Sequence, residues 1–283
     1  MRENSMKDRK TPARIEITQF PKGKRIAVTT SFDDGQIHDR RVVEAFNKWG
    51  LKGTFNLNSA KLSRKEQRSD AHIEAAEVAK LFEGHEVAVH TVTHPHLTKL
   101  DDAQIVEEVL GDRKALEDLV GYPVRGMAYP YGSYDQHVID VIRRLGIVYS
   151  RTCENDPRHF PAKEPLAWAS NGHMFHKDPC PMNEKFEKFY SNQHATGVFF
   201  IWGHSYEFDR GNCWDMLEKI FKPISGKPDV WYCTNIELFD YEDARKRLVI
   251  AANRQSVYNP SSTTVTVNVD GNLLDIEPGL KVL

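Results

Sequence analysis

The sequence predicts an α/β protein built as a distorted (β/α)7-type barrel, with a small C-terminal β-hairpin extension. Short apolar runs rich in β-branched residues alternate with segments of helical period, which is typical of parallel strands joined by helical crossovers. Polar residues collect at the ends of the predicted strands, where barrels of parallel strands place their ligand and catalytic groups. About seven candidate strands, and no GxGxxG or GxxxxGK[ST] motif, favour a barrel over an open doubly wound sheet.

Helix signals recur along the chain. The first predicted helix begins at Asp39, which can cap it, and Gly50 is placed to end it at Trp49. Its apolar residues fall on one face, as burial against a sheet requires. Similar patterns predict helices at 73–82, 101–121, 138–146, 184–190, 214–221 and 236–252.

The predicted strands lie between these helices, within 25–35 and at 53–57, 86–90, 126–129, 147–149, 198–202 and 230–233. Residues 151–181 lack a clear period and contain five prolines, so we expect a long loop over one rim. Such loops in compact domains are usually functional. Aromatic side chains in this loop are candidates for stacking on sugar rings: His159, Trp168, His173 and His176.

The C-terminal residues have a different pattern. TTVTVNV and NLLDI alternate around Asp270-Gly271, a preferred hairpin turn. Because a lone hairpin is marginally stable, we expect it to pack on the barrel or to pair with 248–251; a small sugar-binding attachment is the alternative. The expected division is an N-terminal extension at 1–24, a barrel at 25–252 and a β-rich appendage at 253–283.

Composition indicates an ordinary globular protein. The chain has 283 residues, 40% of them hydrophobic, and a net charge of -2, which gives no basic field for nucleic acid or a membrane surface. The N-terminal residues lack an apolar core of signal-peptide length, so for the chain as given we expect a cytoplasmic location. Four cysteines without a CxxC pair are expected to be reduced thiols. Composition leaves the oligomeric state open.

Side chains able to bind a metal follow two of the predicted strands. RIAVTTSFDDG supplies Asp33 and Asp34, and EVAVHTVTHPH supplies His90 and His94. Two carboxylates and two imidazoles suit zinc or a similar divalent ion, with cobalt and nickel as alternatives. Alone, an Asp-Asp-Gly sequence is more often a turn, and a His-x-x-x-His spacing is a weak pattern. Their joint occurrence at strand ends favours a metal site.

Four motifs, SFDDG, HTVTHPHL, YPYG and WGHSYEF, resemble in this order those of the polysaccharide deacetylases, the NodB-homology group of carbohydrate esterases. The resemblance spans roughly residues 25–240 and implies a distorted β/α barrel that uses a metal to remove acetyl groups from N-acetylated sugars. It also implies a role for each matched residue: Asp33 as general base, Asp34, His90 and His94 as metal ligands, Tyr131 as a backbone N–H donor to the oxyanion, and His204 as general acid.

Two positions depart from the family pattern. Many members carry an arginine that pairs with the base directly before their Pro-Pro-Tyr-Gly type motif, where this chain has Ala128 in AYPYG. We expect Arg151 to orient Asp33 instead, with Arg125 as the alternative. The later Asp-Trp motif, which tunes the catalytic histidine, has no clear match, and Asp156 is only a candidate. These departures indicate a divergent subgroup whose substrate need not be chitin or peptidoglycan.

Two other functions suit the same motifs. Relatives of this barrel hydrolyse cyclic amides or ureides, which release no acetate. The chain is alternatively a catalytically silent carbohydrate-binding protein, although the intact set of acidic and histidine residues weighs against it.

Overall fold

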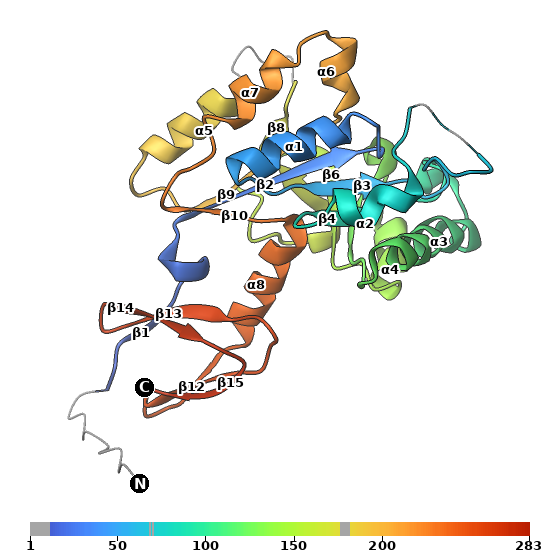
Figure 1. The fold of residues 1–283 in the computed structure, drawn as a ribbon. Coiled ribbons are helices and arrows are strands. Elements are labelled where there is room, and N and C mark those ends of the chain that lie inside the picture. The colour runs from blue at the N-terminus through green and yellow to red at the C-terminus, as the bar shows by residue number, and fades with distance from the viewer. Residues whose placement is uncertain (1–11, 68, 70, 176–181) are drawn as a thin grey trace. The chain divides into compact units, whose positions relative to one another are not determined.

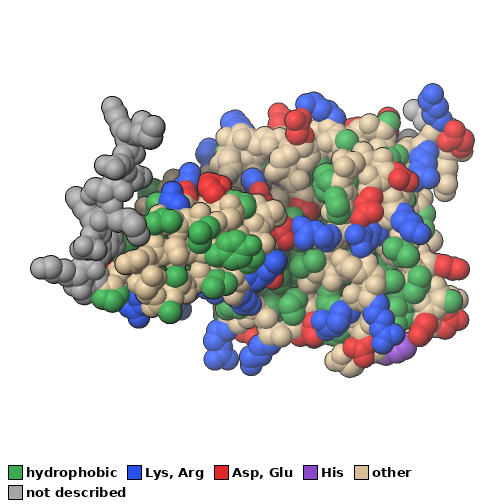
Figure 2. Space-filling model, turned by 90° about the horizontal axis from the view of Figure 1, so that it is seen from below, with side chains coloured by type: hydrophobic (Ala, Val, Ile, Leu, Met, Phe, Trp, Pro, Cys, Tyr) green, Lys and Arg blue, Asp and Glu red, His purple; other side chains and the backbone are tan. Residues whose placement is uncertain are grey.

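The computed structural model describes residues 12–67, 69, 71–175 and 182–283. The chain divides into two compact units, one formed by residues 26–239 and one that joins residues 12–25 to residues 240–283. This division differs from the expected boundary at residue 252. Within the described residues, no helix combines the length and the apolar character that crossing a bilayer requires. Basic and acidic side chains are interspersed over the face drawn in Figure 2.

A parallel sheet forms the centre of the larger unit (Figure 1). Its strands lie in the order β7-β6-β5-β4-β3-β2-β9-β8, and β10 pairs with the first residues of β2. Neighbouring strands run parallel, so the predicted α/β class with a parallel sheet is confirmed. The strands are β2 (Ile26–Asp33), β3 (Thr54–Leu57), β4 (Glu86–Val89), β5 (Gly126–Ala128), β6 (Tyr149–Asn155), β7 (Trp168–Ser170), β8 (Gly172–His173), β9 (Gly197–Gly203) and β10 (Val230–Tyr232).

The two edge strands of this sheet, β7 and β8, lie next to each other in the sequence. β7 and β8 are consecutive in sequence, yet β7 pairs with β6 while β8 pairs with β9. Trp168 of β7 also stacks on Phe200 of β9, with 4.3 Å between ring centroids. Residues 168–173 therefore link the two ends of the strand order, as a distorted barrel requires.

Helices connect the strands of this unit (Figure 1). Glycine at position 50 ends the first of them in a left-handed conformation, φ 68°, as predicted. Asp39 does not cap this helix: it is the first helical residue, and its buried carboxyl group accepts a hydrogen bond from Ser205 Oγ (2.6 Å). The helices are α1 (Asp39–Trp49), α2 (Val78–Leu81), α3 (Asp102–Val120), α4 (Gln136–Arg144), α5 (Met182–Ser191), α6 (Tyr206–Arg210) and α7 (Asp215–Phe221). A further helix, α8 (Asn235–Arg247), begins in this unit and ends in the second one.

Aromatic packing fixes the central strand that leads to the site. Phe32 of β2 packs against Phe55 of β3 and Phe46 of α1, with centroids 5.8 and 5.7 Å apart. Phe221 of α7 closes the group, 5.0 Å from Phe46. Because these rings are fully buried, the residue after Phe32 is held at the rigid end of a packed strand.

The expected long loop at 151–181 is wrong at 151–155 and at 168–173. β6 continues to Asn155, and β7 and β8 follow within the same range. The polar side chains of Arg151 and Thr152 hid the strand from a search for apolar runs, although both are buried and hydrogen-bonded. Residues 176–181, including His176, lie outside the described residues.

The second unit is made of antiparallel strands. The predicted hairpin around Asp270-Gly271 is present, and it pairs with the N-terminal strand β1 rather than with 248–251. The last predicted helix ends at Arg247, and the following β11 pairs with β12. The two strand orders are β1 (Ile15–Ile17), β13 (Val265–Val269), β14 (Asn272–Ile276), and β11 (Val249–Ile250), β12 (Ser256–Asn259), β15 (Gly279–Val282).

Candidate metal and catalytic site

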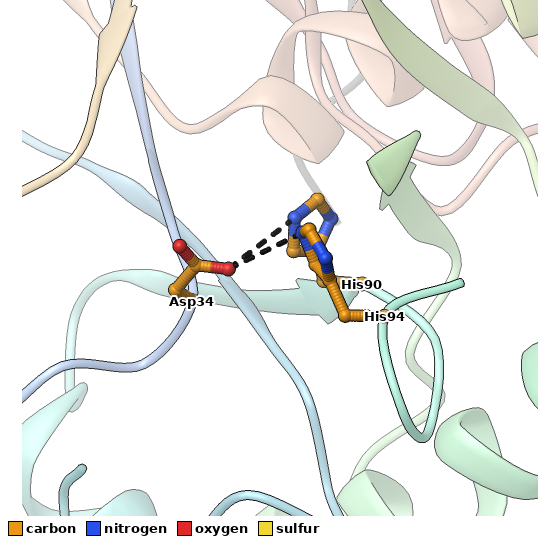
Figure 3. Close-up of side chains that lie close together, drawn as sticks. All are labelled: Asp34, His90 and His94. Atoms are coloured by element: carbon orange, nitrogen blue, oxygen red, sulfur yellow. Dashed lines mark ion pairs between the residues drawn. The ribbon is translucent and has the colours of Figure 1, made fainter. Parts of the chain in front are cut away.

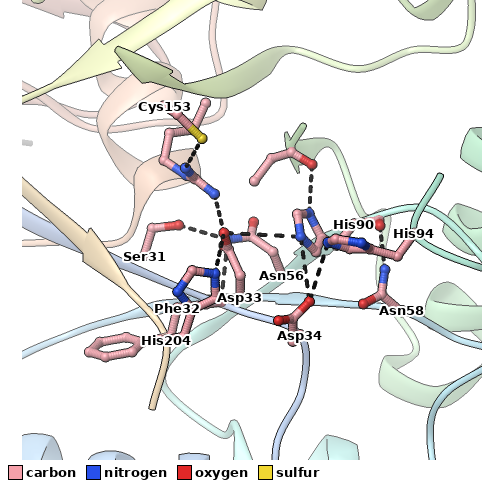
Figure 4. A network of polar contacts seen from close by, with 12 residues as sticks. Ser31, Phe32, Asp33, Asp34, Asn56, Asn58, His90, His94, Cys153 and His204 are labelled. Carbon is pink, nitrogen blue, oxygen red and sulfur yellow. Dashed lines mark hydrogen bonds and ion pairs between the residues drawn. The ribbon is translucent and has the colours of Figure 1, made fainter. Parts of the chain in front are cut away.

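Asp33 and Asp34 lie where β2 ends. The backbone N–H of Asp34 donates to Asn56 O (3.0 Å), which ties this end to β3. Asp34 has a left-handed backbone, φ 79°, which is uncommon for a residue with a side chain. His90 Nε2 lies within 4.0 Å of both consecutive carboxylates, but their other neighbours differ: Asn56, Arg151 and His204 surround Asp33, and His94 faces Asp34 (Figure 4).

Asp34, His90 and His94 converge at this rim (Figure 3). Asp34 Oδ1 lies 3.8 Å from His90 Nε2 and 3.4 Å from His94 Nε2. Lys61 Nζ is farther away, at 4.0 Å. Among the described residues this oxygen is buried without a hydrogen-bond partner, which is costly for a carboxylate unless a cation satisfies it. The three residues expected as ligands thus fit a divalent metal ion by position and by donor type.

The ring of His90 is oriented by its other nitrogen. Nδ1 lies 2.7 Å from Ala128 O at the end of β5, so this nitrogen carries the proton and Nε2 keeps its lone pair toward Asp34. Asp112 of α3 accepts the backbone N–H of His90 (3.0 Å) and that of Ser59 (2.7 Å). Burial lowers the pKa of His90 and, with the nearby His90 ring, lowers the pKa of His94 to about 4. Both imidazoles are therefore neutral at pH 7, as metal ligands must be.

Asp33 lies in a buried cluster of polar side chains (Figure 4). Asn56 Nδ2 donates to its Oδ1 (2.8 Å), and Arg151 Nη2 forms an ion pair with its Oδ2. His90 Nε2 and His204 Nε2 lie 4.0 and 3.9 Å from Oδ2. Burial alone would raise the pKa of Asp33, but Arg151, the two imidazoles and Asn56 together hold it well below its usual range. The carboxylate is therefore ionised at neutral pH.

Arg151 reaches Asp33 from β6. The strand register pairs Arg151 with Ala128, so it stands beside the position where the family motif carries its arginine. The guanidinium also lies over the ring of Trp202, 4.1 Å from its centroid. Arg125, the alternative, precedes β5 and so lies at the amino end of the strand, away from the site rim.

Tyr131 lies in a short 3-10 turn, Pro130–Gly132, beside the candidate metal ligand His94. Its backbone is left-handed, φ 56°, and the residue is 62% exposed. The ring stacks on His96, with centroids 4.1 Å apart, and meets His94 edge-on at 4.5 Å. The turn at Pro130–Gly132, which contains the expected N–H donor Tyr131, is thereby packed against the segment of His94 and His96.

His204 directly follows β9, across Asp33 from the candidate ligands His90 and His94 (Figure 4). Burial would lower the pKa of His204, but a hydrogen bond to Glu207 and the charge of Asp33 raise it. Asp156, the candidate for tuning this histidine, accepts the backbone N–H of Arg158 in its own turn (2.8 Å).

Two contacting residues were not among those expected, and a third, His173, was expected only as a ring for stacking on sugars. Asn56 had a signal, since it is one of the two polar residues of the buried strand TFNL. Glu207 follows His204 at the helical spacing of three, which also predicts contact. The contact of His173 with His204 had no usable signal, because it arises only through the pairing of β8 with β9.

Comparison with known proteins gives several matches. A family model described as polysaccharide deacetylase matches residues 21–150. The chain is 28% identical over 144 residues to the peptidoglycan-N-acetylglucosamine deacetylase PgdA of Listeria monocytogenes, covering 49% of this chain and 29% of that protein. It is 38% identical over 66 residues to a chitooligosaccharide deacetylase of Bradyrhizobium sp., covering 23% of this chain and 30% of that protein. The chain thus spans less than a third of the length of either relative.

Solved structures share the fold. A Mycobacterium smegmatis protein assigned to the polysaccharide deacetylases superposes with a TM-score of 0.60 at 17% identity, covering 83% of this chain and 96% of that one. The Xyl-CE4 domain of a multidomain xylanase from the hindgut metagenome of Trinervitermes trinervoides gives 0.52 at 15% identity, covering 78% and 92%. At these identities the likeness concerns the fold alone.

Proposed function

We propose that this chain, which belongs to the polysaccharide deacetylase family, is a metal-dependent hydrolase that removes acetyl groups from N-acetylated sugars or oligosaccharides. The observation that carries the proposal is the convergence of a candidate ligand set and a separate ionised carboxylate at the strand ends of one sheet. Asp34, His90 and His94 are the proposed ligands, and zinc suits them best, with cobalt or nickel as alternatives.

Hydrolysis of the acetamide breaks the bond between carbonyl carbon and nitrogen, and it yields acetate and a free amine. When bound, a divalent ion would polarise the acetyl carbonyl and lower the pKa of a water molecule to about 7. The protein must then accept a proton from the attacking water, deliver one to the leaving amine, and stabilise the negative charge on the acetyl oxygen.

Asp33 is suited to accept the proton. Arg151 and Asn56 hold its carboxylate ionised and apart from the Asp34 oxygen that faces the imidazoles. A base that is positioned by two donors does not have to reorganise during the reaction. Arg151 is thus proposed to orient Asp33 rather than to contact the substrate.

His204 is suited to deliver the proton to the amine. Its Nε2 faces Asp33 from the β9 side, opposite His90 and His94 in the segment that follows β4. The raised pKa of His204 keeps more of it protonated near neutral pH than for a free imidazole. The backbone N–H of Tyr131 is the proposed donor to the acetyl oxygen.

Acetate release tests the proposal. Purified protein, stripped with EDTA and resupplied with zinc, cobalt or nickel, is incubated with N-acetylated chitooligosaccharides, and acetate is measured by a coupled assay. We expect release that depends on added metal. Sugar binding without acetate under all three metals, or turnover of a ureide without acetate, would overturn it.

A further inference from the structure

Glu207 links two histidines beside the proposed catalytic pocket. Its Oε2 lies 3.0 Å from His173 Nε2 and 3.3 Å from His204 Nδ1. The same oxygen accepts the backbone N–H of His204 (3.0 Å). Three elements therefore meet on one carboxylate oxygen: the end of β8, the end of β9 and the start of α6.

The positions of the protons follow from the neighbours of His173. The backbone N–H of Phe175 lies 3.1 Å from His173 Nδ1, which must accept it, so a neutral His173 carries its proton on Nε2. That proton points to Glu207 Oε2. His204 Nδ1 faces the same acceptor and carries a proton too, which leaves His204 Nε2 as the nitrogen that faces Asp33.

We propose that Glu207, held in place by His173, is the positioning residue for His204: it fixes the orientation of the ring and stabilises its protonated form as the proton donor. This inference rests on the proposed function. In the family, the Asp-Trp motif that this chain lacks is expected to tune the catalytic histidine. The inference assigns that role to Glu207, three positions after His204.

The charges around His204 are compatible with this role. Asp33 faces its Nε2 from β2 at 3.9 Å, and Glu207 faces its Nδ1 from α6. The rings of Tyr206 and His173 lie 4.9 and 5.8 Å from the His204 ring, and Asp34 acts from farther away. Burial would raise the pKa of Glu207, but hydrogen bonds from His173 and His204 lower it to about 2, so Glu207 is a stable anion at neutral pH.

A second cation is the competing explanation. His173, His204 and Glu207 lie close enough together to ligate one. In the observed arrangement, however, His173 Nδ1 already accepts a backbone N–H, and Nε2 points a proton at the carboxylate. A cation there would have to displace that proton and break the contact.

Glu207→Gln tests the proposal because it removes the charge and keeps the shape and an accepting oxygen. The control is Asp209→Asn, which removes an exposed carboxylate from the same helix, where it contacts His38 and Trp214 instead of His204. Zinc-loaded protein with isotope-labelled histidine is titrated by NMR, and the His204 signal is assigned by its loss in His204→Gln. We expect the pKa of His204 to fall by about one unit or more in Glu207→Gln and to stay unchanged in the control.

Kinetics supply a second readout. In Glu207→Gln we expect kcat to fall about 10-fold or more, with its alkaline limb moved to lower pH and KM little changed. His173→Phe should lower kcat because Glu207 loses a donor, and His173→Gln should restore most of it through its amide N–H. The His173 pair remains informative if Glu207→Gln fails to fold.

Two results would overturn the inference. One is an unchanged pKa of His204 in folded Glu207→Gln. The other is a second equivalent of zinc that wild type binds and His173→Phe loses. The NMR titration needs no substrate, so the two proposals can fail separately. If the pKa of His204 shifts in Glu207→Gln but wild type releases no acetate, the deacetylase proposal is wrong and the coupling of Glu207 to His204 still holds.

Discussion

Arg151 and Asp33 form a buried ion pair between residues 118 positions apart in sequence, and it joins β6 to β2. Both side chains are almost completely buried, so each charge depends largely on the other for compensation. Arg151 is the register partner of Ala128, the residue in the position of the family arginine. The guanidinium of Arg151 thus reaches Asp33 from β6, the strand next to the one that carries Ala128.

Arg151→Met should therefore destabilise the protein by about 3–5 kcal/mol, because it leaves the Asp33 carboxylate buried and unpaired. Urea unfolding followed by circular dichroism measures the change. The matched control is Arg143→Met, which breaks the half-exposed ion pair with Glu164 and should cost less than about 1 kcal/mol. Equal losses in the two variants would contradict a special dependence of Asp33 on Arg151.

Restoring the family position offers a companion test. The double variant Ala128→Arg/Arg151→Ala should recover part of the activity that Arg151→Ala loses, since the two positions lie side by side in the sheet. Acetate release by the single and double variants measures the recovery. If the double variant is less active than Arg151→Ala, an arginine at position 128 of β5 does not take the place of Arg151 beside Asp33.

Asp33→Asn should bind metal as wild type does and lose about 100- to 10,000-fold in turnover, because the amide cannot accept a proton. Inductively coupled plasma mass spectrometry gives the metal content, and acetate release gives the rate. Thermal unfolding shows whether the variant is folded despite the unpaired Arg151. Full activity would contradict the role of Asp33 as the base.

His94→Ala should weaken metal binding by more than about 100-fold, since loss of an outer hydrogen-bond partner alone costs about 10- to 100-fold. His96→Ala is the control: His96 lies two positions after His94 in sequence, and its imidazole stacks on Tyr131. Competition with a zinc-sensitive dye measures both affinities. Metal content equal to wild type in His94→Ala would contradict its assignment as a ligand.

Asp39 should make stability depend on pH. Burial raises the pKa of Asp39 to about 8, against the opposing hydrogen bond from Ser205, so the folded protein keeps a proton that the unfolded chain releases near the ordinary aspartate pKa of 3.8. This contribution to stability is complete below about pH 4 and is lost as the pH rises through about 8. Asp39→Asn removes this pH dependence, because an amide does not ionise.

The difference in unfolding free energy between Asp39→Asn and wild type should therefore grow in favour of the variant from pH 5 to pH 8, by at most about 1.4 kcal/mol per pH unit. Urea unfolding at four pH values measures it. Asp118→Asn, at an exposed position of α3, should show no such trend. A constant difference for Asp39→Asn would mean that its carboxyl group is already ionised in the folded protein.

Much of this arrangement was accessible from the sequence. Apolar, β-branched runs mark buried strands, and parallel strands bring their carboxyl ends to one edge, so Asp33, Asp34, His90 and His204 were predictable neighbours. The α/β class and the hairpin at Asp270-Gly271 follow from such patterns and are confirmed. The resemblance to polysaccharide deacetylases, which rests on the four motifs and not on periodicity, is confirmed as well.

Only the tertiary structure decided the rest. The contact of Arg151 with Asp33 depends on the register between β5 and β6, and that of His173 with Glu207 on the pairing of β8 with β9. Strand register is set by side-chain packing and backbone hydrogen bonds between segments far apart in the chain, which no local pattern contains. The sequence by itself therefore determined which strand ends carry the chemistry, and the three-dimensional pairing determined which charged groups support it.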